Sequence, residues 1–234
     1  MDDTIKASHV RKKSDSAANA FVTTLAFRGM KETYEEVLAN EGAEIIYVTN
    51  ALDTIMNDSH SKFIKNNEFP KGKIFFRKGS ADTHKYSTIK NYLLSNLDID
   101  KLILVGDNGE RDILFYDQIA QEFKDRLTSI NTYIRIVYSE PYKVLPLAEN
   151  QKGFVSPLEL LADLTVSNFI KVERYYEIAG KQSQEILVAE KTDSKSPQYF
   201  PSWLTCKGFD PGSYEELMTP IIEKGFEKVR SICQ

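Results

Sequence analysis

Residues 101–112 read KLILVGDNGERD, and this stretch decides the fold class. It opens with a near-continuous apolar run, which is typical of a parallel strand buried on both faces. A glycine follows, and then Asp107 and, five residues later, Asp112. Open α/β sheets bind ligands at the carboxyl edge of their strands, and carboxylate oxygens suit a hard divalent cation such as Mg²⁺. The alternative interpretation is a Gly-Asn-Gly turn in which Asp112 simply caps the next helix.

Short apolar runs alternate with amphipathic stretches up to about residue 139, which predicts βα units and a parallel sheet. Apolar residues three or four positions apart predict the helices. We expect further strands at 44–48 and 133–138, a weaker strand at 73–76, and helices at 31–40, 85–97 and 112–123.

The sequence changes character after residue 141. Ser156 opens a Ser-x-x-Glu capping box with proline at the first helical position, so a helix begins there. A second Ser-x-x-Glu at 213–216 predicts another helix, kinked by Pro220, and residues 191–200 predict an exposed loop. We therefore expect a core of residues 1–140 and a mostly helical C-terminal extension of residues 141–234.

The composition is that of a globular protein: 234 residues, 41% hydrophobic, with a net charge of −4. This charge gives no electrostatic footprint for nucleic acid. Two cysteines argue against a disulfide framework or a cysteine zinc site, and no apolar run approaches the roughly 20 residues of a membrane span. The first residues lack the basic and apolar regions of a signal peptide, so we expect a cytoplasmic protein.

Three further segments carry candidate functional residues. They are the acidic start at residues 2–4, Thr49 and Asn50 after the first expected strand, and Lys85 at the start of a helix. Each has an ordinary structural explanation, namely a solvated chain end, a turn and a surface lysine. Turned inward, the hydroxyl of Thr49 can bind a phosphate oxygen, and Lys85 supplies a cation to offset carboxylates and phosphate.

In chain order these segments read Asp-Asp-Thr, strand-Thr, Lys before a helix, and strand-Gly-Asp-x4-Asp. This order resembles the four motifs of the haloacid dehalogenase superfamily. Over about residues 2–138 the chain more closely resembles the catalytic domain of actin-patch-type phosphatidate phosphatases. The segments that carry this resemblance are residues 2–6, 29–30, 47–49, 69–72, 84–85 and 106–112.

The resemblance implies a three-layer Rossmann-like haloacid dehalogenase core with a parallel sheet, and a Mg²⁺-dependent phosphatase that works through an aspartyl-phosphate. It implies that Asp2 is the general acid/base and also a metal ligand through its backbone carbonyl. Asp107 is then a metal ligand that Asp112 supports, and Lys85 acts in catalysis. We expect the phosphorylated substrate to contact Thr4, Thr49, Asn50 and Lys85.

One departure from the family pattern is serious. If Asp2 is the second aspartate of Asp-x-Asp, the nucleophile lies one position before Met1, and the strand that should deliver it is missing from this sequence. Either the natural protein is longer and active, or the chain is a non-catalytic binding or scaffold protein on the same fold. The retained motif residues favour the first explanation, and we expect the short chain alone to have little activity.

The spacing of the motifs bears on the substrate. About 35 residues separate Thr49 from Lys85, which leaves no room for a large cap over the site. An uncapped site admits a bulky substrate such as a lipid phosphate, and basic residues near Lys71 and Arg77 could meet an anionic membrane surface. A nucleotide-binding protein is disfavoured, because neither Gly-x-Gly-x-x-Gly nor a P-loop occurs.

Overall fold

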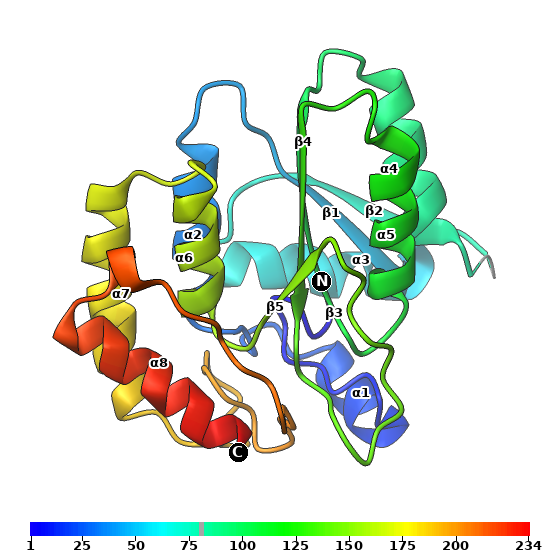
Figure 1. Ribbon diagram of the computed structural model, residues 1–234. Coiled ribbons are helices and arrows are strands. Elements are labelled where there is room, and N and C mark those ends of the chain that lie inside the picture. The colour runs from blue at the N-terminus through cyan, green and yellow to red at the C-terminus, as the bar shows by residue number, and fades with distance from the viewer. Residues whose placement is uncertain (80–81) are drawn as a thin grey trace.

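The computed structural model describes residues 1–79 and 82–234. Its strands form two sheets, and every pair of neighbouring strands is parallel (Figure 1). One sheet pairs β1 (Ile46–Leu52) with β2 (Lys73–Arg77), and the other has the order β3 (Lys101–Asp107), β4 (Ser129–Arg135), β5 (Gln151–Phe154). The predicted α/β fold class with a parallel sheet is confirmed.

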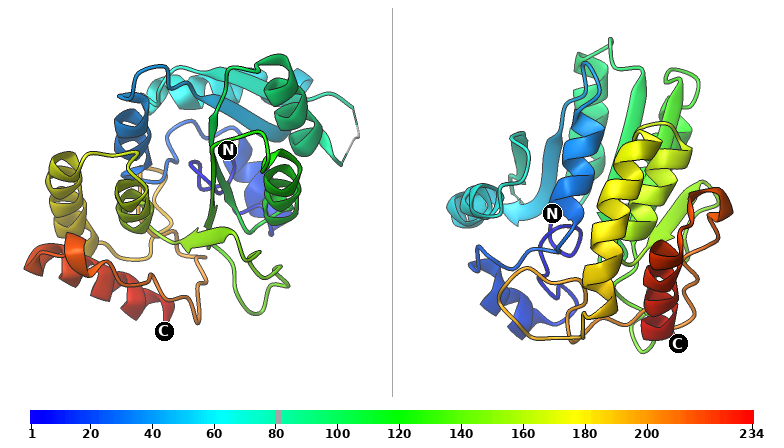
Figure 2. Two further views of the ribbon diagram at one scale, coloured as in Figure 1. Left: turned by 45° about the horizontal axis from the view of Figure 1, so that its top comes forward. Right: turned by 90° about the vertical axis from the view of Figure 1, so that its left-hand side faces the viewer.

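Helices cover the strands on both sides, which gives three layers (Figures 1 and 2). On one side α2 (Met30–Leu38) packs against α6 (Pro157–Val166), and on the other α4 (His84–Ser95) packs against α5 (Asp112–Phe123). The remaining helices are α1 (Lys13–Ala20), α3 (Asp53–Asn66), α7 (Val172–Leu187), η1 (Glu215–Leu217) and α8 (Pro220–Cys233).

The expected helices of the core are confirmed to within two residues at each end. The strand expected at 133–138 is wrong in its bounds, because β4 ends at Arg135. The apolar residues that follow leave the ladder, and the backbone N–H groups of Val137 and Tyr138 instead donate to the side-chain oxygen of Asn108 at 3.0 and 3.1 Å. Val137 and Tyr138 are buried although they lie outside the strand, so the apolar run in the sequence extends beyond the end of β4.

The C-terminal extension contains the three helices α6, α7 and α8, and it also supplies strand β5. The capping box at Ser156 is confirmed, since its side chain accepts from the N–H of Leu158 and Glu159 accepts from the N–H of Ser156. The second capping box is wrong: only the 3₁₀ turn η1 forms there. Pro220 does not kink α8 but begins it, where its fixed φ and missing N–H are no disadvantage.

Residues 191–200 contain no helix, but their end is not an exposed loop. Tyr199 and Phe200 are buried, and Gln198 exchanges backbone hydrogen bonds with Ala26 and Arg28. One apolar core unites both expected parts of the chain, with Phe27, Phe154 and Phe226 among its members. The extension is thus packed into the core.

The two cysteines of the chain are paired with each other. Cys206 and Cys233, both almost fully buried, form a disulfide that joins the end of α8 to the segment before it. Two cysteines are too few for a framework of several disulfide bridges, but their number does not show whether they form one bridge with each other.

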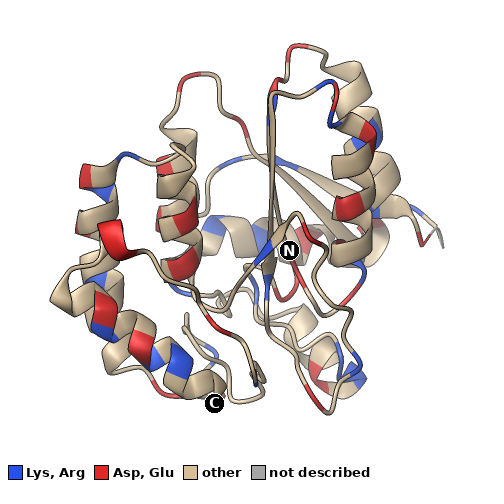
Figure 3. Cartoon of the chain, viewed as in Figure 1, with Lys and Arg blue, Asp and Glu red and all other residues tan. Residues whose placement is uncertain are grey.

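In the part of the chain that the structure describes, no helix has the length and apolar character needed to cross a membrane. Lys and Arg alternate with Asp and Glu along the helices, and neither sign is confined to one side of the view in Figure 3.

Removing the disulfide should destabilise the protein substantially. The bridge closes a loop across a sequence separation of 27, and the lost restraint on the unfolded chain corresponds to about 3–4 kcal/mol. We expect a Cys206→Ala/Cys233→Ala variant to show this loss in urea unfolding. A reducing agent should destabilise the wild type to a similar extent and leave the variant unchanged. Equal stability of the two proteins without reductant would contradict the bridge.

Candidate active site

The carboxyl ends of the strands meet at one edge, because all pairings are parallel. The edge holds the ends of β3 and β4, where Asp107 and Arg135 are partners in register. The start of the chain lies against this edge: Thr4 Oγ1 donates to Asp107 Oδ2 at 3.0 Å, and Arg135 Nη1 donates to the Thr4 carbonyl at 3.3 Å. Segments more than 100 residues apart in sequence thus form one cluster.

Lys85 and Asp112 form the ion pair at its centre. Lys85 Nζ lies 2.5 Å from Asp112 Oδ1 and 3.6 Å from Glu110 Oε2, and the Lys85 and Asp112 side chains are 4% and 1% exposed. The other Asp112 oxygen accepts from the backbone N–H of Asp107 at 3.3 Å. Asp112 is therefore not the helix cap of the alternative interpretation: Arg111 is the N-cap of α5, and Asp112 is its first residue.

The cluster holds an excess of negative charge. Burial and the charge of Asp112 raise the pKa of Asp107 well above its ordinary value, and Asp3 and Glu110 act in the same direction, while Lys85 opposes them. Burial alone lowers the pKa of Lys85, but the charges of Asp112, Glu110 and Asp107 outweigh it and raise that pKa. Lys85 is therefore a permanent cation that only partly offsets the buried carboxylates.

Residues 1–10, here called the motif-one loop, are fixed by Asp3. Its carboxylate accepts backbone N–H groups from Ser8, His9 and Val10 at 2.7 to 2.9 Å and the hydroxyl of Tyr138 at 2.6 Å. Burial raises the pKa of Asp3, and these four donors oppose the rise. Asp3, fully buried, is the residue of this loop whose charge acts on Asp107.

Asp2 points toward α3. Its carboxylate accepts from Ser8 Oγ at 2.7 Å and lies 3.3 Å from His60 Nε2. Burial raises the pKa of Asp2, but His60, the ammonium group of Met1 and the Ser8 hydroxyl outweigh this effect and hold it below its ordinary value. The hydrogen bonds of Asp2 thus go to Ser8 and His60, whereas Thr4 is the residue that contacts Asp107.

Thr49 and Asn50 lie in the irregular last part of β1, where the pairing with β2 shifts register. Asn50 reaches the cluster, since its Nδ2 donates to Glu110 Oε2 at 2.8 Å. Thr49 is 1% exposed, and its hydroxyl accepts from the N–H of Ala51 at 3.2 Å. Direct contacts therefore join Thr4, Asn50, Lys85, Asp107 and Asp112, while Thr49 stays within its own turn.

No pattern in the sequence indicated that His60, Tyr138 and Arg135 belong to the site. The guanidinium of Arg135 is fully buried, 3.4 Å from the centre of the Phe27 ring, and burial lowers its pKa to about 9. Arginine at the end of an apolar strand gave no signal of burial, and a pairing such as Asp3 with Tyr138 depends on long-range packing. The acidic pair at residues 2–3 was noticed, but no pattern told which carboxylate faces the cluster.

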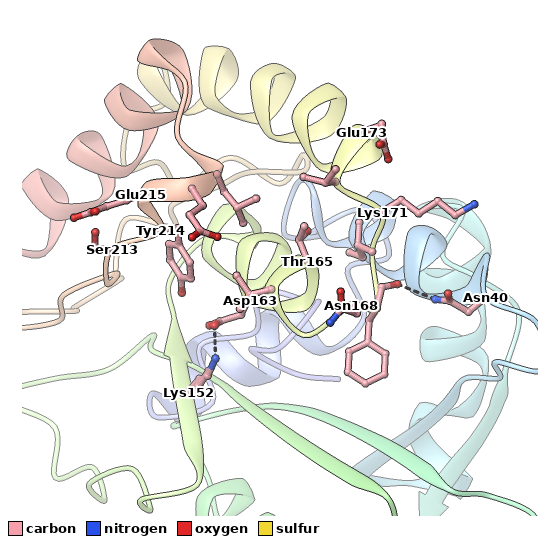
Figure 4. Close-up of a pocket in the computed structure, with 16 residues that line it drawn as sticks. Asn40, Lys152, Asp163, Thr165, Asn168, Lys171, Glu173, Ser213, Tyr214 and Glu215 are labelled. Atoms are coloured by element: carbon pink, nitrogen blue, oxygen red, sulfur yellow. Dashed lines mark hydrogen bonds and ion pairs between the residues drawn. The ribbon is translucent and has the colours of Figure 1, made fainter.

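A pocket among the described residues lies away from this cluster. It has a volume of about 1080 Å³ and is lined by the end of α6, the start of α7 and residues 213–217 (Figure 4). Within it Lys152 and Asp163 form an ion pair of 2.5 Å. Because α6 returns antiparallel to β5, its carboxyl end lies at the opposite edge from Asp107. None of the predicted site residues lines this pocket.

The inner strands of the two sheets, β1 and β3, face each other across the site. The same apolar clusters contact both: one includes Val48 of β1 and Leu104 of β3, and the other includes Tyr47 of β1 and has Ile103 of β3 packed against it. Helices α4 and α5 pack together over both sheets. The two parallel sheets thus lie side by side. Their neighbouring edge strands, β1 and β3, belong to different sheets and are not hydrogen-bonded to each other.

Comparison with known proteins agrees with this arrangement. The family model of the phosphatidate phosphatase APP1 catalytic domain matches residues 1–136, which contain the whole cluster. The chain belongs to this family. The APP1 catalytic-domain match ends just after β4, so most of the chain beyond that strand lies outside it.

A relative from Schizosaccharomyces pombe (strain 972), described as uncharacterized protein C29B5.04c, is 29% identical over 154 residues. The aligned region covers 60% of this chain and 25% of that protein, so the chain spans about a quarter of the relative's length. No solved structure matches.

Replacing Asp107 by asparagine should stabilise the metal-free protein at alkaline pH. The amide can keep the contacts with Thr4 and Gly109 and removes one buried like charge. Because the folded-state pKa of Asp107 is raised, its ionisation costs stability above that pKa, and the cost disappears as pH falls toward 4. We expect a gain on the order of 1 kcal/mol at pH 8, measured by urea unfolding in chelator.

The exposed Asp125 supplies the matched control. Asp125→Asn should leave the free energy of unfolding unchanged at both pH values. A loss of stability in Asp107→Asn at pH 8, or a gain that does not shrink on acidification, would show that the cluster carries no excess negative charge.

Proposed function

We propose that the chain is the catalytic-domain portion of a Mg²⁺-dependent phosphatase that hydrolyses a phosphomonoester, with a lipid phosphate such as phosphatidate as its substrate class. The observation that carries this proposal is the buried cluster of Asp107, Asp112 and Lys85 against the motif-one loop at one sheet edge. Family membership over residues 1–136 supports it.

The donor chemistry of the cluster fits a magnesium ion. Within residues 1–79 and 82–234 no group of three or more His, Cys, Asp or Glu side chains is arranged to hold a metal. Asp107 and Asp112 nevertheless supply hard oxygen ligands, and the raised pKa of Asp107 is the signature of carboxylates that lack enough positive charge. These two residues would hold the ion, with the backbone carbonyl of Asp2 as a further ligand. When bound, Mg²⁺ neutralises charge on the phosphate and its attacking group.

The chain's own residues fill the remaining roles. Lys85, a permanent cation, holds the phosphate, and Thr4, Thr49 and Asn50 offer hydroxyl and amide groups to its oxygens. Asp2 donates a proton to the leaving oxygen as the phosphorus–oxygen bond breaks, and then takes a proton from the attacking water. In this chain His60, the Met1 ammonium and Ser8 hold the Asp2 pKa low, which favours only the form that takes the proton. The proton-donating form requires a higher pKa in the longer protein, where residue 1 carries no ammonium group.

The nucleophile is proposed to come from a strand that precedes Met1. A parallel strand between β1 and β3 would join the two sheets into one and pair both inner edges, which otherwise present unpaired backbone groups. A strand ending one residue before Met1 delivers an aspartate to the cluster. In the chain alone, the turn of residues 1–6 is held instead by backbone hydrogen bonds to the Met1 carbonyl.

The surroundings of the site support a large anionic substrate. Between Thr49 and Lys85 the chain forms only α3 and β2 as regular elements in its described part, so a globular cap is lacking there. Of the basic residues singled out in the sequence, Arg77 is the last residue of β2, at the carboxyl end of the strand, and Lys78 follows it. Residues 11–13, which are basic and exposed, follow the motif-one loop. These cations suit an anionic membrane surface.

The experiment compares the chain alone with a longer form that carries an upstream strand ending in aspartate. Each is assayed with an aryl phosphate and Mg²⁺, and then with phosphatidate vesicles. We expect turnover by the longer form only, and at least a 100-fold loss in Lys85→Ala. The control is Lys90→Ala, on the same helix but paired with Glu122 at the surface, which should keep full activity.

Each alternative has its own result. Turnover by the short chain that Asp107→Ala abolishes would refute the missing strand. Unchanged activity in Lys85→Ala would refute its role at the phosphate. A longer form that folds, binds Mg²⁺ and hydrolyses neither substrate would favour the non-catalytic scaffold protein on the same fold.

A further inference from the structure

An aromatic cluster joins the C-terminal extension to the motif-one loop. Its members are His9, Tyr138, Tyr142 and Trp203, here called the aromatic brace. The ring of Trp203 stacks on His9 at 4.5 Å between centroids and 9° between planes, and on Tyr138 at 5.6 Å and 17°. Tyr142 meets Tyr138 edge-on at 5.0 Å. Three of the four residues lie beyond residue 136, where the family match ends.

The brace holds the motif-one loop at two points. The hydroxyl of Tyr138 donates to Asp3 Oδ2 at 2.6 Å, and the backbone N–H of His9 donates to Asp3 Oδ1 at 2.9 Å. Asp3 and His9 have φ values of 55° and 59°, a left-handed conformation that is uncommon for any residue other than glycine, although Asp and His adopt it more often than most. The loop therefore depends on outside contacts for its shape.

The ring of His9 is fixed in turn. Its Nδ1 lies 3.0 Å from Asp15 Oδ2 and its Nε2 lies 3.3 Å from the Tyr142 hydroxyl, so both nitrogens are engaged. These two contacts fix the edge of the imidazole ring, and Trp203 stacks on its flat face.

The brace also reaches the other half of the site. A Cβ atom on Gly109 would lie 2.8 Å from the ring of Tyr138, 2.7 Å from Val10 and 2.8 Å from Asp107 Oδ1. The side chain of Asn108 binds the backbone of Tyr138 on both sides, accepting from its N–H and donating to its carbonyl at 2.7 Å. A shift of Tyr138 would therefore move both Asp3 and the loop that carries Asp107.

Trp203 itself is anchored by the extension. The next residues pair with the segment after β4: the N–H of Thr205 donates to the Val137 carbonyl at 3.2 Å, and its hydroxyl accepts from the N–H of Ser139 at 3.0 Å. Cys206 then bonds to Cys233 at the end of α8. Trp203 thus lies on a short segment that is fixed by the backbone pairing of Thr205 and by the disulfide of Cys206.

We propose that Trp203 is a positioning residue for the catalytic site: by stacking on His9 and Tyr138, it holds the motif-one loop in the shape that presents Thr4 to the cluster. The C-terminal extension thereby completes a site whose reacting groups all lie in the family domain. The catalytic part of this inference rests on the proposed phosphatase function, whereas the structural part does not.

Hydrogen exchange of the backbone amides tests the structural part without any substrate. The informative amides are those of Ser8, His9 and Val10, which donate to Asp3. In the full chain, Trp203→Ala should raise their exchange rates about tenfold, while the amides of β3 and α5 stay unchanged. Trp203→Phe keeps a flat ring and should restore the rates to within about twofold of the wild type.

The control is Tyr176→Ala, which removes a partly exposed aromatic ring from α7 in the same extension. It should leave the exchange of the three amides unchanged. Unchanged exchange of these amides in Trp203→Ala, or a rise spread evenly over the whole protein, would overturn the proposal.

The catalytic part is tested in the form of the protein that hydrolyses aryl phosphate. There Trp203→Ala should lower kcat about tenfold and leave KM within about twofold, because the loop is misplaced while the phosphate-holding Lys85 is not. An unchanged kcat, or an effect on KM alone, would overturn it. If no form of the protein hydrolyses phosphate esters, the proposed function fails, and the exchange measurement still decides the role of Trp203.

Discussion

The buried ion pair between Lys85 and Asp112 is the interaction on which the rest of the site depends. It joins the starts of α4 and α5, and these two helices cover both sheets on one face. Removing either partner from such a pair leaves an uncompensated buried charge, which costs about 3–5 kcal/mol. The pair is therefore both a structural link between the two sheets and the place where the charge balance of the site is set.

That balance is incomplete, and this explains the chemistry. Lys85 and the buried Arg135 face the carboxylates of Asp107, Asp112, Asp3 and Glu110, and burial together with these carboxylates raises the pKa of Asp107. A divalent cation is the simplest group that offsets these carboxylates, because burial strengthens electrostatic interactions that water would screen. In the proposed function, the phosphate of the substrate adds negative charge, and the same cation would offset it.

The sequence predicted the fold well where periodicity and capping agree, as in α5 and at the capping box of Ser156. It failed where tertiary packing produces a pattern that resembles a local one. Residues 136–138 are apolar because Val137 and Tyr138 are buried after the end of β4. Pro220 begins a helix, whereas the sequence alone suggested a kink. Helices α1 and α3 gave weak signals, since their buried faces are narrow and partly polar.

At the site, the residue types of four motifs identified Thr4, Asn50, Lys85, Asp107 and Asp112 as neighbours. The different surroundings of Asp2 and Asp3 follow from contacts with His60 and Tyr138, which no local pattern encodes.

The C-terminal extension changes how the family domain is best understood in this chain. It adds a strand to the sheet, shares the apolar core and places Trp203 against the motif-one loop. The site is thus assembled from both parts of the chain, although its reacting groups come from one.

The central claim is that carboxylates from distant segments form one cluster that accepts a divalent cation. Anomalous diffraction from crystals grown with Mn²⁺, a substitute for Mg²⁺, tests it most directly. The account predicts a single strong anomalous peak beside the carboxylates of Asp107 and Asp112, lost in crystals of Asp107→Asn. A peak elsewhere, or a fully ordered site without one at millimolar Mn²⁺, would contradict it.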